Sequence, residues 1–326
     1  MSLSRSDAKP LAAVTGATGF IGRHVVAALL EAGYRVRALV RSEPADPRWQ
    51  ELRLEMVPGD LGDRAALSRL VDGAQVVIHL AGLIKAPSRA LFFAANRDGT
   101  GALAAAVREH AAHAHFLLIS SLAARQPRLS DYAASKRAGE DQALAMLGPQ
   151  VTVLRPPAVY GPGDRETLVF FQLARHRVVP IPAPASARAA AIHVGDLARA
   201  IATLAGTSPS GIVAAIADAS AQGYSWREIL LAAARAVGNP APKLVRLPAA
   251  VLKGIAAAGD AACRFGKINM LTSQKLRELR HPDWTVSEAE RITPAGWQAR
   301  YDLDSGFADA VAWYRKAGWL PPAPTC

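Results

Sequence analysis

The sequence predicts an α/β fold, a doubly wound parallel sheet with a smaller C-terminal lobe, and three observations support this. Short apolar strands alternate with helical segments through the first half of the chain, and a glycine-rich turn follows the first strand. The alternation ends after Gly163, where proline-rich and aromatic segments begin. Strands separated by helices of this length imply right-handed crossovers and therefore parallel strands.

The expected elements follow one another from Leu11. Strands are expected at Leu11–Val14, Arg35–Val40, Met56–Val57, Val76–Leu80, Phe116–Ile119 and Val151–Leu154, with a last strand within Gly211–Ala217. Helices are expected at His24–Glu31, Arg64–Val71, Gly99–His110 and Ser135–Met146. Pro180–Pro184 is expected to be a connector, and Ile192–Leu204 a return to the core. The sheet domain should therefore span 9–218, with 161–190 contributing to the lobe formed by 219–326.

Composition limits the class of protein. The 326 residues are 51% hydrophobic and 20% charged, which suits a globular protein with a large core. Cys263 and Cys326 have no metal-ligand neighbours, so we expect neither a metal site nor disulfides. No signal peptide and no membrane-spanning segment is apparent, and we expect a cytoplasmic protein.

The net charge of +11 is unevenly distributed. Residues 243–281 contain eight bases and two acids, a net charge of +6. Such a surface attracts anionic lipid, phosphorylated ligands or an acidic partner. We do not expect a nucleic-acid partner, because no binding module or aromatic-interleaved basic stretch accompanies the charge. A solvated basic face is the simpler alternative.

The turn Thr15–Gly22, which reads TGATGFIG, predicts a dinucleotide site. It follows a strand and opens a helix, where glycines let the backbone approach a pyrophosphate and the helix N-terminus offers free N–H groups. The second strand ends Val40–Arg41, with no acid before Glu43. A carboxylate here would favour NAD, whereas a base favours the 2′-phosphate of NADP. The sequence therefore predicts NADP in preference to NAD.

Tyr132 and Lys136 are the candidate catalytic pair. On a helix, residues four apart share one face. A tyrosine is a weak acid with a reference pKa near ~10, and a neighbouring cation favours its phenolate form. Ser120 and Ser121 end the fifth strand, where a hydroxyl could hydrogen-bond a substrate carbonyl. The pattern predicts hydride and proton transfer.

With these motifs the chain resembles the extended short-chain dehydrogenase/reductase family over nearly its whole length. The matching stretches are Thr15–Gly22, Gly59–Leu61, His79–Gly82, Asn96–Thr100, Ser120–Ser121, Tyr132–Lys136, Arg155–Gly163 and His193–Asp196. The family's fold is a Rossmann sheet with a substrate lobe.

The resemblance implies roles for individual residues. Tyr132 is the acid/base, Lys136 also holds the nicotinamide ribose, and Asp60 meets the adenine. Many members have a third hydroxyl residue where this chain has Leu122, so Ser121 is the favoured catalytic hydroxyl. The cofactor residues expected in full are Gly16, Thr18, Gly19, Phe20, Ile21, Gly22, Arg41, Asp60, Leu61, Leu80, Ala81, Gly82, Asn96, Ser120, Lys136, Pro156 and Val159.

The C-terminal part directs the choice of substrate. Met270–Trp284 is similar to members of the 3β-hydroxysteroid dehydrogenase and dihydroflavonol reductase branch, and to bacterial reductases near sphingolipid synthesis. This favours interconversion of a ketone and an alcohol on a bulky apolar substrate, such as a 3-keto sphingoid, ceramide or steroid-like lipid. Val251, Leu252 and Ile255 are expected to share one helix face within the basic segment 243–281, which could contact a membrane or form core. Trp297, Tyr301, Trp313, Tyr314 and Trp319 are expected in the core of the lobe.

Two other functions remain open at this point. One is a nucleotide-sugar epimerase or dehydratase that holds its NAD tightly through a complete cycle. The other is a non-catalytic subunit that keeps the dinucleotide for structure, although Tyr132 and Lys136 are both present. A homodimer through a helical face is common in the family and is also expected here.

Overall fold

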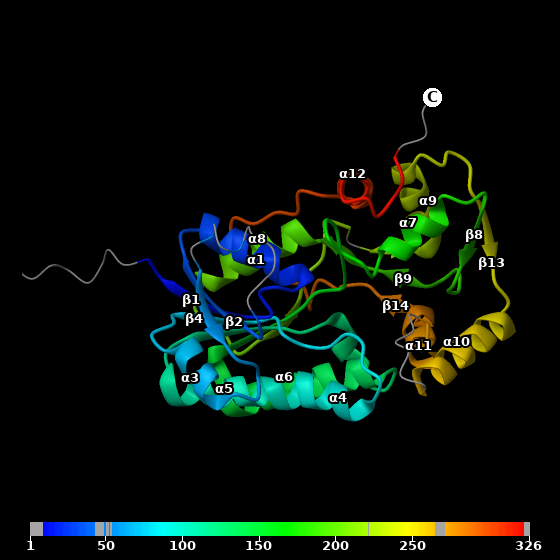
Figure 1. Ribbon diagram of the computed structural model, residues 1–326. Helices are drawn as coiled ribbons and strands as arrows, with labels where there is room; N and C mark the ends of the chain where they lie inside the picture. Colours follow the sequence, from blue (N-terminus) through cyan, green and yellow to red (C-terminus); the bar gives the residue numbers. More distant parts are fainter. Residues whose placement is uncertain are drawn as a thin grey trace, which may run out of the picture.

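A seven-stranded parallel sheet forms the centre of the computed structural model, which describes residues 9–42, 49, 52, 54–220, 222–264 and 271–322 (Figure 1). Its order is β11-β6-β5-β4-β1-β2-β3. The strands are β1 (Leu11–Thr15), β2 (Arg35–Val40), β3 (Glu55–Pro58), β4 (Val76–His79), β5 (His115–Ile119), β6 (Val151–Arg155) and β11 (Val213–Ala215). The predicted fold class is confirmed. The order reverses between β1 and β4, and such a switch point is where doubly wound sheets bind ligands.

Helices cover both faces of the sheet (Figure 1). On one face lie α1 (Phe20–Glu31) and α8 (Val194–Ala205), and on the other α3 (Arg64–Val71), α5 (Gly99–His110) and α6 (Asp131–Leu147). In β1, Ala12 and Val14 pack into the first core cluster, while Leu11 and Ala13 pack into the second. Because successive strand residues point to opposite faces, an uninterrupted apolar strand buries both sides.

Short elements follow the strand ends that surround the switch point. After β4 come α4 (Arg89–Phe93) and the π-helix η1 (Ala94–Asp98), which continues into α5. The 3₁₀ helix η2 (Leu122–Arg125) follows β5, and η3 (Gly148–Gln150) precedes β6. After β6, β7 (Ala158–Tyr160) pairs in parallel with β10 (Ala191–His193), which leads into α8.

The C-terminal lobe is built on helices and small sheets. Its helices are α7 (Leu168–Ala174), α9 (Trp226–Val237), α10 (Ala249–Arg264), α11 (Ser273–Arg280) and α12 (Leu303–Lys316). β8 (Val178–Ile181) pairs with β13 (Lys243–Arg246), and β9 (Arg188–Ala189) lies between β12 (Tyr224–Ser225) and β14 (Asp283–Trp284). The expectation that Pro180 belongs to a connector is wrong: it lies in β8, opposite Val245, in a two-stranded pair where a missing N–H is tolerated.

An aromatic core holds the lobe together. Phe171, Phe307 and Tyr314 are buried and pack ring against ring, with Trp313 and Trp319 beside them. Trp313, Tyr314 and Trp319 confirm their predicted place in the lobe core, whereas Tyr301 lies outside this cluster, with its ring centroid 3.8 Å from that of His193. Ser225 and Glu228 cap α9 reciprocally.

Trp297 does not belong to that core. It packs into the sheet domain against α8, and its indole N–H donates to the Asp196 carbonyl over 2.9 Å. The Asp196 carboxylate, fully buried, accepts from the backbone N–H groups of Arg300 and Tyr301, each at 3.0 Å. The chain between β14 and α12 thus returns to the sheet domain, because a buried aspartate needs these donors. The division at 9–218 and 219–326 stays a prediction.

No helix in the described part of the chain combines the length and the apolar character that crossing a membrane requires.

Candidate active site

The glycine turn after β1 is shaped by close backbone approach. Gly16 has φ +72°, and a Cβ there would stand 2.6 Å from the Ala81 backbone nitrogen. A Cβ on Gly22 would stand 2.0 Å from the Gly16 carbonyl oxygen. Gly19 is the N-cap of α1 and offers no side chain to accept a hydrogen bond. The first backbone N–H groups of α1 can therefore donate to an anion. The backbone therefore forms a cradle that fits a pyrophosphate.

A buried hydrogen-bond chain ties this turn to the next strand. Thr100 Oγ1 donates to the Asn96 carbonyl over 2.8 Å and so must accept from His79 Nε2, 3.0 Å away. His79 Nδ1 then accepts from Thr15 Oγ1 at 2.6 Å, which itself accepts from the Ala81 N–H. Burial lowers the pKa of His79 to about 3, so the ring is neutral, as this arrangement requires.

The Asn96 side chain holds the loop that follows β4. Its side chain is buried; Oδ1 accepts from the Leu83 N–H at 2.8 Å, and Nδ2 donates to the Leu83 carbonyl and to Ser135 Oγ, each at 2.9 Å. With its amide groups committed, Asn96 fixes the backbone beside Gly82. Its expected role as a cofactor-binding residue stays a prediction.

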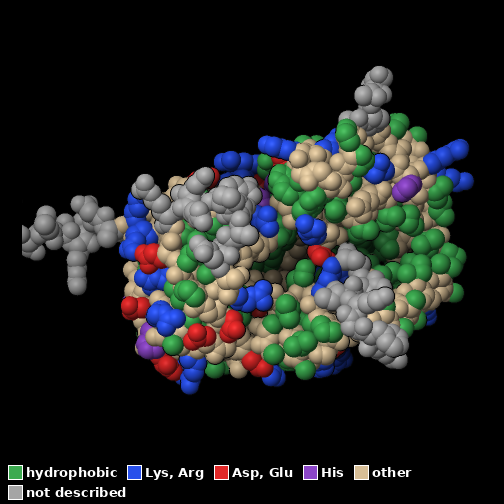
Figure 2. Space-filling view, viewed as in Figure 1, with side chains coloured by type: hydrophobic (Ala, Val, Ile, Leu, Met, Phe, Trp, Pro, Cys, Tyr) green, Lys and Arg blue, Asp and Glu red, His purple; other side chains and the backbone are tan. Residues whose placement is uncertain are grey.

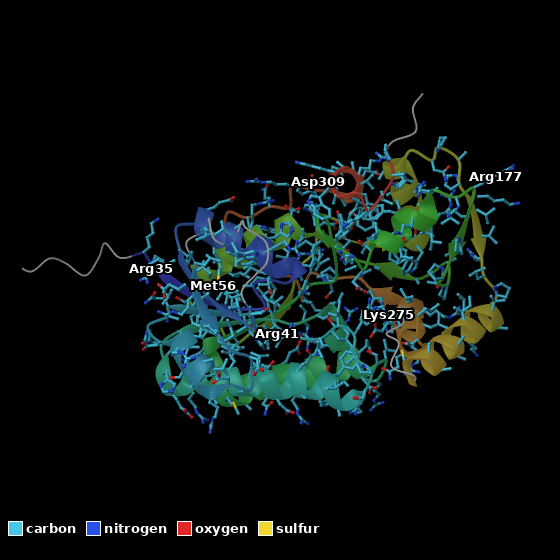
Figure 3. All side chains as sticks on the ribbon, viewed as in Figure 1. Arg35, Arg41, Met56, Arg177, Lys275 and Asp309 are labelled. Atoms are coloured by element: carbon cyan, nitrogen blue, oxygen red, sulfur yellow. The ribbon has the colours of Figure 1, made fainter. Side chains whose placement is uncertain are left out.

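The remaining predicted cofactor residues cluster at the carboxyl ends of the strands. Arg41 follows β2; Asp60 and Leu61 follow β3; Leu80, Ala81 and Gly82 follow β4; Ser120 follows β5; Pro156 and Val159 follow β6. Figure 2 shows the surface hollowed between the sheet domain and the lobe, and Figure 3 places Arg41 on one side of this region and Lys275 on the other. A dinucleotide bound across the switch point would meet these residues.

The candidate catalytic residues Tyr132 and Lys136 lie on the first two turns of α6. Ser130 caps the helix by accepting from the Ala133 N–H at 3.0 Å. Lys136 Nζ donates to the Ile119 carbonyl at 3.0 Å, which holds the ammonium group at the end of β5. Burial lowers the pKa of Lys136 to about 8, so most of it is charged at neutral pH. Tyr132 and Lys136 thus lie on one helix face, as predicted.

Tyr132 is held as a protonated phenol. Burial raises its pKa to about 12, a hydrogen bond with Ser121 opposes the rise, and the charge of Glu278 adds to it. The expectation that Lys136 lowers this pKa is not met in this arrangement, because burial dominates. The contact with Ser121 agrees with the choice of Ser121 as the catalytic hydroxyl.

The two positions beside Ser121 differ in character. Ser120 Oγ is buried and has no hydrogen-bond partner among the described residues, as expected of a hydroxyl that meets a bound molecule. Leu122 is buried in a small apolar cluster with Ala190, Ala217 and Val286. A hydroxyl at position 122 would face this cluster.

A clamp from the lobe, which sequence reasoning missed, holds the start of α6. Gln274 of α11 accepts from the Asp131 N–H and donates to the Asp131 carboxylate, both at 2.7 Å. The buried Glu278 carboxylate accepts from Ser130 Oγ and, at 3.0 Å, from Lys275 Nζ. The available signal was that Glu278 is one of only two acids in the basic segment 243–281.

A second ion pair fixes the end of β6. Glu140, four residues after Lys136, is buried and accepts both hydrogen bonds of the Arg155 fork, at 2.9 and 2.5 Å. Its charge raises the pKa of Lys136 against the effect of burial. Glu140 therefore joins α6 to the segment that begins at Pro156.

The loops that follow β4 and β7 meet near the glycine turn. Lys85 Nζ lies 2.7 Å from Glu166 Oε1, and both side chains are partly exposed. A Cβ on Gly163 would lie within 4.0 Å of Arg23 and Phe20, at the start of α1. The ion pair thus spans two loops beside the cradle.

Fold and site together are those of a dinucleotide-dependent enzyme, with Ser121, Tyr132 and Lys136 as candidate catalytic residues at the switch point of the sheet. Residues 12–216 match the model of the NAD dependent epimerase/dehydratase family. The chain is 47% identical to the ceramide reductase of Caulobacter vibrioides, over 97% of this chain and 98% of that protein. It belongs to the NAD-dependent epimerase/dehydratase family, as an enzyme of the short-chain dehydrogenase/reductase type.

Solved structures show the same fold. The crystal structure of gox2253 has a TM-score of 0.74 at 22% identity, over 96% of this chain and 100% of that one. WbmH of Bordetella bronchiseptica, in complex with NAD⁺, has a TM-score of 0.70 at 21% identity, over 95% and 100% of the two chains.

Proposed function

We propose that this enzyme is an NADPH-dependent reductase of a ketone on a bulky, lipid-like substrate, with a 3-keto ceramide or 3-keto sphingoid base as the first candidate. The high identity to a ceramide reductase extends over both chains, including the lobe, where substrate specificity is expected. A 3-keto steroid is the next candidate, because the segment Met270–Trp284, which contains α11, is similar to members of the 3β-hydroxysteroid dehydrogenase branch.

One observation supports reduction most directly: Tyr132 is a partly buried, protonated phenol in contact with the hydroxyl of Ser121. Reduction of a ketone needs a proton donor at the carbonyl oxygen, and a phenol whose pKa is raised to about 12 retains its proton at neutral pH. The same centre could run in the oxidative direction, but only after Tyr132 loses that proton.

The residues divide the chemistry between them. When bound, the cofactor would provide the hydride that the carbonyl carbon accepts. Ser121 donates a hydrogen bond to the carbonyl oxygen, and Tyr132 transfers its phenolic proton to that oxygen as the alcohol forms. Lys136, held beside Gly82 by its hydrogen bond to the Ile119 carbonyl, would offer its ammonium group to the ribose hydroxyls of the cofactor. Ser120 is a further candidate donor to the cofactor.

The preference for NADPH rests on Arg41. It is exposed directly after β2, where its guanidinium could meet the 2′-phosphate with two parallel hydrogen bonds. Glu43, the first acid after this strand, lies outside the described residues. Arg41→Ala should weaken NADPH binding about tenfold and leave NADH binding nearly unchanged, as measured by fluorescence titration.

The test is a direct assay of the purified chain. We expect NADPH oxidation that depends on a 3-keto ceramide and is lost in Tyr132→Phe. Turnover of a 3-keto sphingoid base or a 3-keto steroid would change the proposed substrate and leave the proposed reaction, ketone reduction, in place. Tightly retained NAD with conversion of a nucleotide sugar would replace the proposal with the epimerase function. Cofactor binding without turnover of any of these would favour the non-catalytic role. The homodimer expected from the family stays a prediction.

A further inference from the structure

Helix α10 presents an apolar face outward. Its inner face is fixed to α11: Leu252 and Ala256 are buried against Leu276, and the Ser273 N–H donates to Asp260 at 3.0 Å. The outer face includes the exposed residues Ala249, Ala250, Val251, Lys253, Gly254, Ile255, Ala257, Ala258 and Ala261. The expectation that Leu252 shares a face with Val251 and Ile255 is therefore wrong.

This outer face is unusual for a helix in contact with water. Val251 and Ile255 are 46% and 47% exposed, and Lys253 is the one charged residue among the exposed positions just named. A helix on the surface of a globular protein normally directs charged and polar residues outward. On α6, for example, the exposed Arg137 and Asp141 form an ion pair. The face of α10 is suited to contact with something apolar.

Bases border this face. β13, which leads directly into α10, places Lys243 and Arg246 at the surface, and Lys243 pairs with Val178, which is 53% exposed. Arg177 precedes Val178 and points away from the body of the molecule (Figure 3). Figure 1 shows β8, β13 and α10 at one end of the molecule, and Figure 2 shows hydrophobic side chains along this end.

These bases have no acidic partner among the described residues. None of Arg177, Lys243, Arg246 and Lys253 forms an ion pair with a described carboxylate, whereas Arg35 pairs with Glu55 and Arg235 with Asp304. Unpaired cations around an apolar strip attract a surface that is both anionic and apolar.

We propose that α10 and the adjoining edge of β8 and β13 dock this enzyme on an anionic lipid bilayer. This rests on the proposed function, because a long-chain keto lipid resides in a membrane. A symmetric contact with a second copy would bring the same bases face to face, so charge favours the bilayer. At 16 residues, α10 is about 24 Å long and lies in the interface rather than crossing it.

The test is flotation of the full chain with vesicles of phosphatidylcholine alone or with phosphatidylglycerol. We expect binding to the anionic vesicles that weakens with salt. Val251→Ser with Ile255→Ser should reduce binding at least about tenfold. The matched control replaces Ile212 and Val213, which are 39% and 38% exposed on the sheet edge, by serine and should bind normally. Equal binding by α10 and control variants would overturn the proposal, as would absence of binding by the unaltered chain.

A charge variant separates the contribution of the bases to vesicle binding from that of the apolar face. Lys243→Gln with Arg246→Gln should lose binding and its salt dependence, while Arg69→Gln with Arg108→Gln, exposed bases on α3 and α5, should not. A dimer that dissociates in the Val251 and Ile255 variant would make a second copy the occupant and overturn the proposal. Reduction of a detergent-dispersed keto lipid should be unchanged in these variants. If the unaltered chain binds vesicles but does not reduce the keto lipid, the proposed function is refuted and the docking surface is not.

Discussion

The two sides of the active site are built in different ways. The cofactor side consists of backbone: the turn from Thr15 to Gly22 and the strand ends beside it, where glycines admit close approach. The side around Tyr132 consists of side chains from distant segments, because Ser121, Ser130 and Glu278 come from a strand end, a helix cap and α11. The first side is specified locally and the second only by tertiary packing, so substitutions should affect them differently.

The largest effect is expected at Tyr132. Tyr132→Phe removes the proton donor and leaves the cradle untouched, so turnover should fall about 10²- to 10⁴-fold with nearly unchanged cofactor affinity. Steady-state kinetics with a 3-keto lipid and titration with NADPH measure the two properties separately. Unchanged turnover would remove Tyr132 from the mechanism, and a matching loss of cofactor affinity would mean that the two sides are not independent.

Gly16→Ala should produce the opposite pattern. The added Cβ would stand 2.6 Å from the Ala81 nitrogen at φ +72°, so the turn must shift and cofactor binding should weaken by about 10- to 100-fold. Gly33→Ala is the control: Gly33 has φ +87°, but nothing lies within 4 Å of its added Cβ. The control should lose about 1 kcal/mol of stability and keep its cofactor affinity. Equal losses of cofactor affinity in the two variants would mean that backbone strain at the glycine, and not the close approach of its Cβ to Ala81, weakens binding.

Glu278 offers a smaller effect with a defined sign. Its negative charge raises the pKa of Tyr132, so Glu278→Gln, which retains an acceptor for Ser130, should lower that pKa. A lower pKa makes the phenolate more available, and alcohol oxidation at a fixed alkaline pH should rise roughly threefold. Lys275→Gln removes the cation that faces Glu278 and should shift the pH profile in the opposite direction. Parallel shifts in both variants would exclude an electrostatic cause.

The same contrast explains how much the sequence could predict. The parallel strands, the glycine turn, and Tyr132 and Lys136 on one helix face all depend on neighbours within a few residues or on strand order. The contact between Ser130 and Glu278 joins residues 148 apart, and periodicity contains no information about it. For the same reason Trp297 lies in the core of the sheet domain instead of the lobe, and Leu252 lies on a different face of α10 from Val251, since an apolar residue does not specify which core it enters.

The ion pair between Lys85 and Glu166 should have the smallest effect, and it tests whether the two sides are linked. It joins the loop after β4 to the loop that follows β7, and both side chains are about a third exposed, so its contribution should be below about 1 kcal/mol. If the pair restrains the loops over the bound cofactor, Glu166→Gln should speed NADPH release about two- to fivefold without changing the rate of the chemical step. Stopped-flow displacement measures release, and single-turnover reduction measures chemistry. A double-mutant cycle with Lys85→Met isolates the pair, because the second substitution should then add little. Fully additive effects on release would mean that each side chain acts through other neighbours and that the loops move independently.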